Sequence, residues 1–197
     1  MRILDAGFVK SVTAISQRKG LPDREICFIG RSNVGKSSLL NGLSMRKIAR
    51  TSTTPGATRL INLYRIRFEQ DGKKREALFS DFPGFGYSKV ARTVYENWQS
   101  MIEGYMIGNE LIRLVLWVLD VRRDFDDLDR MLLEWLEENR LPFSVVLTKA
   151  DKEGRGKSLE KKQNLQRIIG DRSVFLFSSK DGTGRRELLA HLAQALE

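Results

Sequence analysis

The chain has 197 residues, 41% of them hydrophobic, and is therefore long enough for one domain with a sizeable core. Lys and Arg number 34 against 25 Asp and Glu, and the formal net charge of +9 suits an anionic partner such as nucleic acid. One cysteine, Cys27, excludes a disulfide framework, and the lack of a long uncharged apolar run argues against a signal peptide or a membrane span. We therefore expect a cytoplasmic protein without integral membrane association.

Strand-like and helix-like patterns alternate along the chain, and neither a repeat nor a linker interrupts them. Strands are predicted over residues 24–30, 59–69, 74–81, 111–120, 142–148 and 173–178. Helices are predicted over residues 36–45, 93–107, 126–139, 157–169 and 184–196. A turn at Asp71-Gly72 should join the second and third strands as a hairpin. The acid-rich DVRRDFDDLDR is typical of a helix start and needs no further function.

The later strands are near-continuous apolar runs, such as LVLWVL and FSVVL, which is typical of parallel strands covered by helices on both faces. The sequence therefore predicts one doubly wound α/β domain over residues 24–197. Its sheet should have six strands, mostly parallel, with one antiparallel edge strand and helices on both faces. Residues 1–23 are expected to form an N-terminal extension packed on this domain. A ligand should lie at the carboxyl ends of the strands.

The first predicted strand runs into GRSNVGKS, which fits the phosphate-binding pattern G-x-x-x-x-G-K-[ST]. Glycines let backbone N–H groups turn inward, and the following helix adds its positive N-terminal end, so the segment should form an anion cradle. Lys36 is expected to reach the β- and γ-phosphates of a nucleotide, and the Ser37 hydroxyl to bind Mg²⁺. The residues expected at the phosphates are Gly30, Arg31, Ser32, Asn33, Val34, Gly35, Lys36, Ser37 and Ser38.

The predicted strand over residues 74–81 ends in Asp81 and is followed by FPGFG, which continues neither a strand nor a helix. Beside a phosphate cradle, an aspartate at a strand end is placed to hold Mg²⁺, directly or through water. The N–H of Gly84 is expected near the γ-phosphate, so that the loop would respond to the presence of that phosphate. We call this predicted switch segment switch II; it comprises Asp81, Phe82, Pro83, Gly84 and Phe85.

Two motifs further along the chain predict which base is bound. The strand that ends in TKAD places Asp151 where its carboxylate can accept from guanine N1–H and the 2-amino group, donors that adenine lacks there. Lys149 is expected to lie along the base. The segment SSK follows the next strand, and the N–H of Ser179 is a candidate donor to guanine O6. The residues expected at the base are Thr148, Lys149, Asp151, Ser178, Ser179 and Lys180.

Five segments, GRSNVGKSSLLN, TPGATRLIN, DFPGFGYSKV, TKAD and SSKDGTG, together resemble the translation-factor-related P-loop GTPases. More narrowly, the chain resembles the EngB (YihA/YsxC) family of bacterial ribosome-biogenesis GTP-binding proteins, over nearly its whole length from Glu25 onward. The resemblance implies GTP binding and slow hydrolysis coupled to assembly of the large ribosomal subunit, with that subunit or its rRNA as the partner. The base motif begins with Thr148 where most GTPases have asparagine, a feature that this family shares.

Phe85 follows the glycine of the D-x-x-G motif, where many GTPases carry a glutamine that orients the attacking water. A phenylalanine ring neither donates nor accepts a hydrogen bond to that water, so hydrolysis should be slow unless another group places it. One candidate is K⁺ held near the phosphates by Asn33, and another is a group that the partner supplies. Alternatively, Phe85 is a hydrophobic tip that packs into the core.

A second switch segment, switch I, is expected within ARTSTTPGATRLIN and comprises Pro55, Gly56, Ala57 and Thr58. A threonine there should coordinate Mg²⁺ and report the γ-phosphate. Thr58 is our choice because a strand begins directly after it, and Thr54 stays open. No Asp or Glu occurs from Ile26 to Phe68, so basic residues near switch I are predicted to face RNA: Arg46, Lys47, Arg50 and Arg59.

Three classes of function remain open. The first, which we favour, is a monomeric GTPase that binds RNA but not DNA and acts as an assembly factor. The second is a GTPase switch recruited to a protein or membrane partner in cell-cycle control or septation, although the C-terminal QALE carries no lipidation signal. The third is a passive binding module whose GTP site is only structural.

Overall fold

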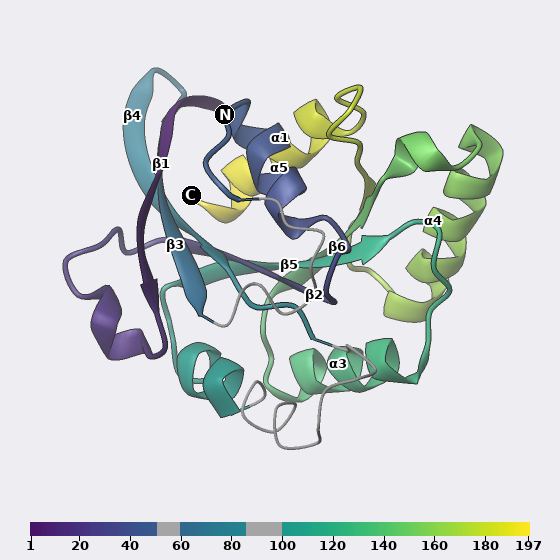
Figure 1. Ribbon diagram of the computed structural model, residues 1–197, viewed down its shortest axis with the longest axis horizontal. Helices are drawn as coiled ribbons and strands as arrows, with labels where there is room; N and C mark the ends of the chain where they lie inside the picture. The colour runs from purple at the N-terminus through teal and green to yellow at the C-terminus, as the bar shows by residue number, and fades with distance from the viewer. Residues whose placement is uncertain (51–59, 86–99) are drawn as a thin grey trace.

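The computed structural model describes residues 1–50, 60–85 and 100–197, and seven strands of this part of the chain form one sheet (Figure 1). Their order is β1-β3-β4-β2-β5-β6-β7. The parallel strands are β2 (Glu25–Gly30), β4 (Lys73–Asp81), β5 (Ile112–Asp120), β6 (Phe143–Thr148) and β7 (Val174–Leu176). β3 (Ile61–Gln70) is antiparallel to β4 and to β1 (Arg2–Val12).

The predicted α/β fold is confirmed, but the predicted sheet of six strands is one strand short. The missing strand is β1, which pairs with β3 and replaces it as the edge strand. Two register shifts interrupt this pairing, and of the residues of β1 only Ala6 and Val12 are buried. Because bulges break the period-two alternation and an edge strand buries few side chains, the sequence of β1 does not show a strand pattern.

The other predicted elements are present with small shifts of their ends. The helices are α1 (Lys36–Ser44), α3 (Asp127–Glu138), α4 (Arg155–Ile169) and α5 (Arg185–Ala195), with helical residues at 100–106 and short 3-10 helices η1 (Ile15–Arg18) and η2 (Ala150–Lys152). Residue 59 and residues 93–99 of the predicted elements lie outside the described residues. The described helices include none that is long and apolar enough to cross a membrane.

Local sequence explains where several elements begin and turn. The predicted hairpin is confirmed, since Asp71 and Gly72 have φ values of 52° and 72°, as a type I′ turn requires. The predicted helix start in DVRRDFDDLDR is also confirmed. The Asp126 carboxylate accepts from the N–H groups of Leu128 and Asp129, at 3.1 and 3.2 Å, and so caps α3.

Two layers of helices cover the two faces of the sheet (Figure 1). Successive residues of β2 alternate between the layers, with Phe28 in the α1 and α5 layer and Ile29 in the other. The α1 and α5 layer is packed by Leu39, Leu40, Leu43, Leu188 and Leu192. The opposite layer is packed by Ile102, Leu132, Leu136, Leu165 and Ile169. Each fully buried leucine stabilises the fold by roughly 2 kcal/mol, so this double layer fixes the sheet edge that carries the loops.

A buried carboxylate lies at the amino end of β2. Glu25 is 0% exposed, and its oxygens accept from Tyr105 Oη at 2.8 Å, from Asn109 Nδ2 at 3.4 Å and from the Ser80 hydroxyl. The Arg18 Nε lies 3.3 Å from the same carboxylate. Buried charges are tolerated when they are paired and hydrogen-bonded, so this network ties η1 and the helix ending at residue 106 to the sheet.

Candidate functional site

The phosphate-binding segment, here called the P-loop, joins the carboxyl end of β2 to α1. Gly30 ends the strand with φ 150°, and a Cβ there would lie 2.3 Å from the carbonyl oxygen of Val118. Gly35 precedes α1 with φ 106°, again in the region that favours glycine. The first N–H groups of α1 have no partner within the helix, so the loop and the helix terminus together form the predicted anion cradle.

The Lys36 ammonium lies inside this loop. Its Nζ donates to the carbonyl oxygens of Gly30 and Arg31 at 3.0 and 3.1 Å, and the residue is 8% exposed. Burial lowers the pKa of Lys36, and the negative charge of Asp81 partly offsets that effect. A desolvated ammonium held by neutral carbonyls would gain strongly from an anionic phosphate, as the sequence predicts for Lys36.

Ser37 and Asp81 meet where the sequence predicts Mg²⁺. The Ser37 hydroxyl donates to Asp81 Oδ2 at 3.3 Å, and Asp81 Oδ1 has no hydrogen-bond partner among the described residues. Burial raises the pKa of Asp81 to about 6, although Lys36 and Ser37 act in the opposite direction. Because hydroxyl and carboxylate oxygens are ligands that Mg²⁺ prefers, these two residues fit the ion. The third predicted ligand, Thr58, lies outside the described residues with Thr54 and the rest of switch I.

Switch II contacts the P-loop directly. The Ser32 N–H donates to the Phe85 carbonyl at 3.0 Å, and the Ser32 hydroxyl donates to the Gly84 carbonyl at 3.2 Å. A Cβ on Gly84 would lie 2.7 Å from the Ser32 backbone, so only glycine permits this approach. Phe82 and Phe85 are 0% and 5% exposed and belong to the core, which agrees with the alternative of a hydrophobic tip packed inside.

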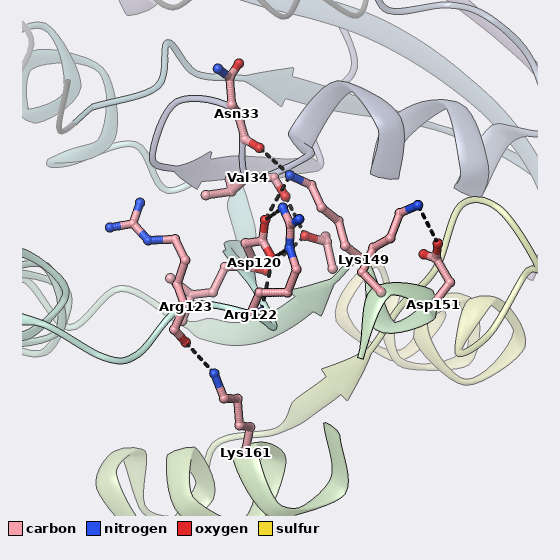
Figure 2. A network of polar contacts seen from close by, with 11 residues as sticks. Asn33, Val34, Asp120, Arg122, Arg123, Lys149, Asp151 and Lys161 are labelled. Atoms are coloured by element: carbon pink, nitrogen blue, oxygen red, sulfur yellow. Dashed lines mark hydrogen bonds and ion pairs between the residues drawn. The ribbon is translucent and has the colours of Figure 1, made fainter. Parts of the chain in front are cut away.

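Two residues of the base motif hold the P-loop from the side of β6. Thr148 is 3% exposed, and its single hydroxyl hydrogen is shared between two backbone carbonyl oxygens, that of Leu119, 2.9 Å from Oγ1, and that of Val34. Figure 2 shows the Lys149 ammonium pointing toward the carbonyl of Asn33, to which it donates at 2.7 Å. The strand end of β6 and the P-loop are thus joined by side chains that the sequence assigned to the base.

The other predicted base-binding residues come together a few residues further on. The Ser178 hydroxyl donates to Asp151 Oδ1 at 3.0 Å, and its oxygen accepts from the Lys180 N–H at 3.2 Å. Ser178 is buried, whereas Ser179 and Lys180 are exposed. The structure therefore brings the two predicted base motifs together, because Ser178 of the second motif is hydrogen-bonded to Asp151 of the first.

Asp120 and Arg122 are members of the site that the sequence prediction missed. Asp120 ends β5 and accepts from Arg122 Nε at 2.9 Å and Nη2 at 2.6 Å, while its Oδ2 lies 2.9 Å from Lys149 Nζ (Figure 2). Burial alone would raise the pKa of Asp120, but the hydrogen bonds from Arg122 and Lys149 hold it well below its usual range. The sequence did contain a signal for Asp120, because this residue ends a buried parallel strand just as Asp81 does.

Comparison with known proteins agrees with this geometry. Residues 25–149 match the family model described as 50S ribosome-binding GTPase. "Probable GTP-binding protein EngB" of Syntrophus aciditrophicus (strain SB) is 40% identical over 197 residues, which is 99% of this chain and 97% of the relative. The protein of that name from Chlorobium luteolum (strain DSM 273 / BCRC 81028 / 2530) is 40% identical over 196 residues, 97% of this chain and 90% of its own.

A solved structure is similar as well. The crystal structure of a probable GTP-binding protein engB superposes with a TM-score of 0.66 at 26% identity and covers 87% of this chain and 98% of that chain. The fold, the P-loop and the paired base motifs define a P-loop GTPase that binds GTP and GDP. Within that class, the chain belongs to the EngB family of GTP-binding proteins.

Proposed function

We propose that this GTPase is a nucleotide-switched factor in the assembly of the large ribosomal subunit and that it hydrolyses GTP slowly. The observation that carries the proposal is the match to a family described as 50S ribosome-binding GTPase, in a chain whose net charge of +9 suits rRNA. The partner would be the large subunit or its rRNA, and the protein would act as a cytoplasmic monomer. Mg²⁺ would be held by Ser37 and Asp81 and would neutralise phosphate charge.

The exposed basic residues after α1 support an RNA-binding surface. Lys47 and Arg50 are exposed, while Arg46 is engaged, because its Nη1 lies 2.6 Å from Asp5 Oδ1. Arg46 thus brings less positive charge to this surface than its sequence position suggests. The fourth candidate, Arg59, lies outside the described residues. Lys47 and Arg50 are therefore the better residues to change.

The central test is co-sedimentation with purified ribosomal subunits. A non-hydrolysable GTP analogue is compared with GDP, at low and at physiological salt. Binding to the large subunit in the GTP form alone, retained at physiological salt, is the expected result. Binding that is equal in both nucleotide states and is lost at physiological salt would contradict the proposal. It would mean that the basic surface attracts RNA only non-specifically.

The surface itself can be tested with charge-matched pairs of substitutions. Lys47→Ala with Arg50→Ala should weaken rRNA binding and reduce the salt slope by about 2, while GTP affinity stays intact. The control pair is Lys73→Ala with Lys74→Ala, which removes the same charge from the exposed β3–β4 hairpin. If both pairs weaken binding equally, the segment after α1 is no specific RNA contact.

The slow hydrolysis follows from the absence of a polar side chain at Phe85, and we propose that K⁺ bound near Asn33 is one way to compensate. Asn33 is exposed, and Figure 2 shows its side chain pointing away from the carbonyl that holds Lys149. GTPase rates should then be higher in K⁺ than in Na⁺, and Asn33→Ala should abolish the difference. Equal wild-type rates in the two salts would leave a group from the partner as the activator.

A further inference from the structure

Thr148 has no hydrogen left to donate to a base. A threonine hydroxyl carries one hydrogen, and both acceptors that it faces in this structure are backbone carbonyl oxygens, those of Val34 and Leu119. The residue is 3% exposed and lies beside Gly35, where an added Cβ would be 3.4 Å from Thr148 Oγ1. Thr148 is therefore committed to the P-loop and to β5.

The Lys149 ammonium is likewise bound by the P-loop and by β5. Its ammonium lies between the carbonyl of Asn33, at 2.7 Å, and the carboxylate of Asp120, at 2.9 Å. Asp120 is itself fixed by two hydrogen bonds from the Arg122 guanidinium, so the ammonium is held from two segments of the chain, the P-loop and the end of β5 (Figure 2). The aliphatic stem of Lys149 remains available to lie along a base, but its ammonium is hydrogen-bonded to the P-loop.

The groups left for the base edge lie at Asp151 and Ser178 to Lys180. Guanine offers donors at N1 and the 2-amino group and acceptors at O6 and N7. A carboxylate at Asp151 matches the two donors, and a backbone N–H at Ser179 matches O6. We propose that this protein recognises guanine through N1–H, the 2-amino group and O6, and that its base motif leaves N7 without a hydrogen bond because Thr148 is a positioning residue for the P-loop.

The proposal makes a prediction for an analogue in which N7 is replaced by a C–H group. If N7 accepts no hydrogen bond from the protein, 7-deaza-GDP should bind as tightly as GDP. If N7 accepts one, its loss should weaken binding roughly three- to tenfold. Inosine diphosphate, which lacks the 2-amino group, is the matched control, because it leaves Asp151 with one donor fewer and should bind about tenfold more weakly or worse.

The measurement is competition of the three unlabelled nucleotides against a fluorescent GDP analogue on the wild-type protein with Mg²⁺. The expected result is a dissociation constant for 7-deaza-GDP within about twofold of that for GDP, together with a clear loss for inosine diphosphate. A loss of about tenfold with 7-deaza-GDP would overturn the proposal. The assay contains no ribosome or RNA, so failure here would leave the ribosomal proposal untouched.

Two variants test the positioning role. Thr148→Val removes the hydroxyl and should weaken GDP, 7-deaza-GDP and inosine diphosphate by the same factor, because the P-loop loses its support while base recognition is unchanged. Thr148→Ser keeps the hydroxyl and should restore the affinity of all three. If Thr148→Val instead weakens GDP alone and brings it level with 7-deaza-GDP, then Thr148 contacts N7 and the proposal is wrong.

Discussion

Two buried carboxylates lie on neighbouring parallel strands of this protein and differ in how they are satisfied. Glu25 at the amino end of β2 has five polar partners, the Cys27 thiol among them, whereas Asp81 at the carboxyl end of β4 accepts from Ser37 and keeps one oxygen without a partner among the described residues. Both are at most 3% exposed, so burial does not separate them. The number of partners does: a satisfied carboxylate is structural, and an unsatisfied one marks a ligand site.

Glu25→Gln should destabilise the fold strongly. This change leaves the Arg18 guanidinium buried without its counter-charge, so the free energy of unfolding should fall by about 3–5 kcal/mol, measured by urea denaturation. The control is Glu76→Gln, which removes an exposed partner of Arg67 and should cost under about 1 kcal/mol. Similar losses in the two variants would remove the distinction between the satisfied carboxylate and an ordinary surface charge.

Asp81→Asn should leave stability nearly unchanged and should lower the rate of GTP hydrolysis. The free energy of unfolding without nucleotide should stay level or rise by about 1 kcal/mol, because the change removes a buried charge that has few partners. GTP hydrolysis should fall by roughly 100-fold, since the carboxylate that supports Mg²⁺ is lost. The two measurements are a melt of the nucleotide-free protein and a phosphate-release assay. A variant that unfolds easily but hydrolyses GTP normally would place Asp81 with Glu25 as a structural group.

Tyr105→Phe removes one hydrogen bond of the Glu25 network and leaves its charges in place. The substitution removes one donor to a carboxylate that keeps four other partners, so it should cost about 1–2 kcal/mol, less than Glu25→Gln. The matched control is Ser11→Ala, which removes an exposed hydroxyl bonded to Asn62 at 2.7 Å. That control should be nearly neutral. A loss for Tyr105→Phe as large as for Glu25→Gln would mean that the network acts as one unit and cannot be divided into single bonds.

The smallest effect concerns His191, whose Nε2 lies 2.9 Å from the Ser144 hydroxyl and whose ring packs on Phe175. Burial lowers the pKa of His191, so the folded state takes up its proton less readily than the unfolded state. Stability is therefore full above the ordinary histidine pKa of about 6.5 and is lost as the pH falls through the folded-state pKa. Urea denaturation on both sides of that value should show this slope in the wild type and a shallower one in His191→Gln.

Much of the fold and of the site follows from sequence alone, where short-range chemistry decides the outcome. The glycines and Lys36 of the P-loop, Asp81 at its strand end and the Asp71-Gly72 turn depend on backbone conformation and on the residue at that position. Edge strand β1 does not follow in this way. Its side chains are mostly exposed, and its place is set by pairing with β3, which lies about 60 residues away along the chain.

Spacing within single segments was enough to predict the class of fold, the phosphate cradle and most of the candidate residues for a guanine nucleotide. Tertiary structure decided which polar side chains are already satisfied. It gave Arg46 a partner in Asp5, Thr148 and Lys149 partners in the P-loop, and Asp120 a place in the site. Such pairings join residues up to 116 positions apart, so they exist only once the sheet brings its strand ends together.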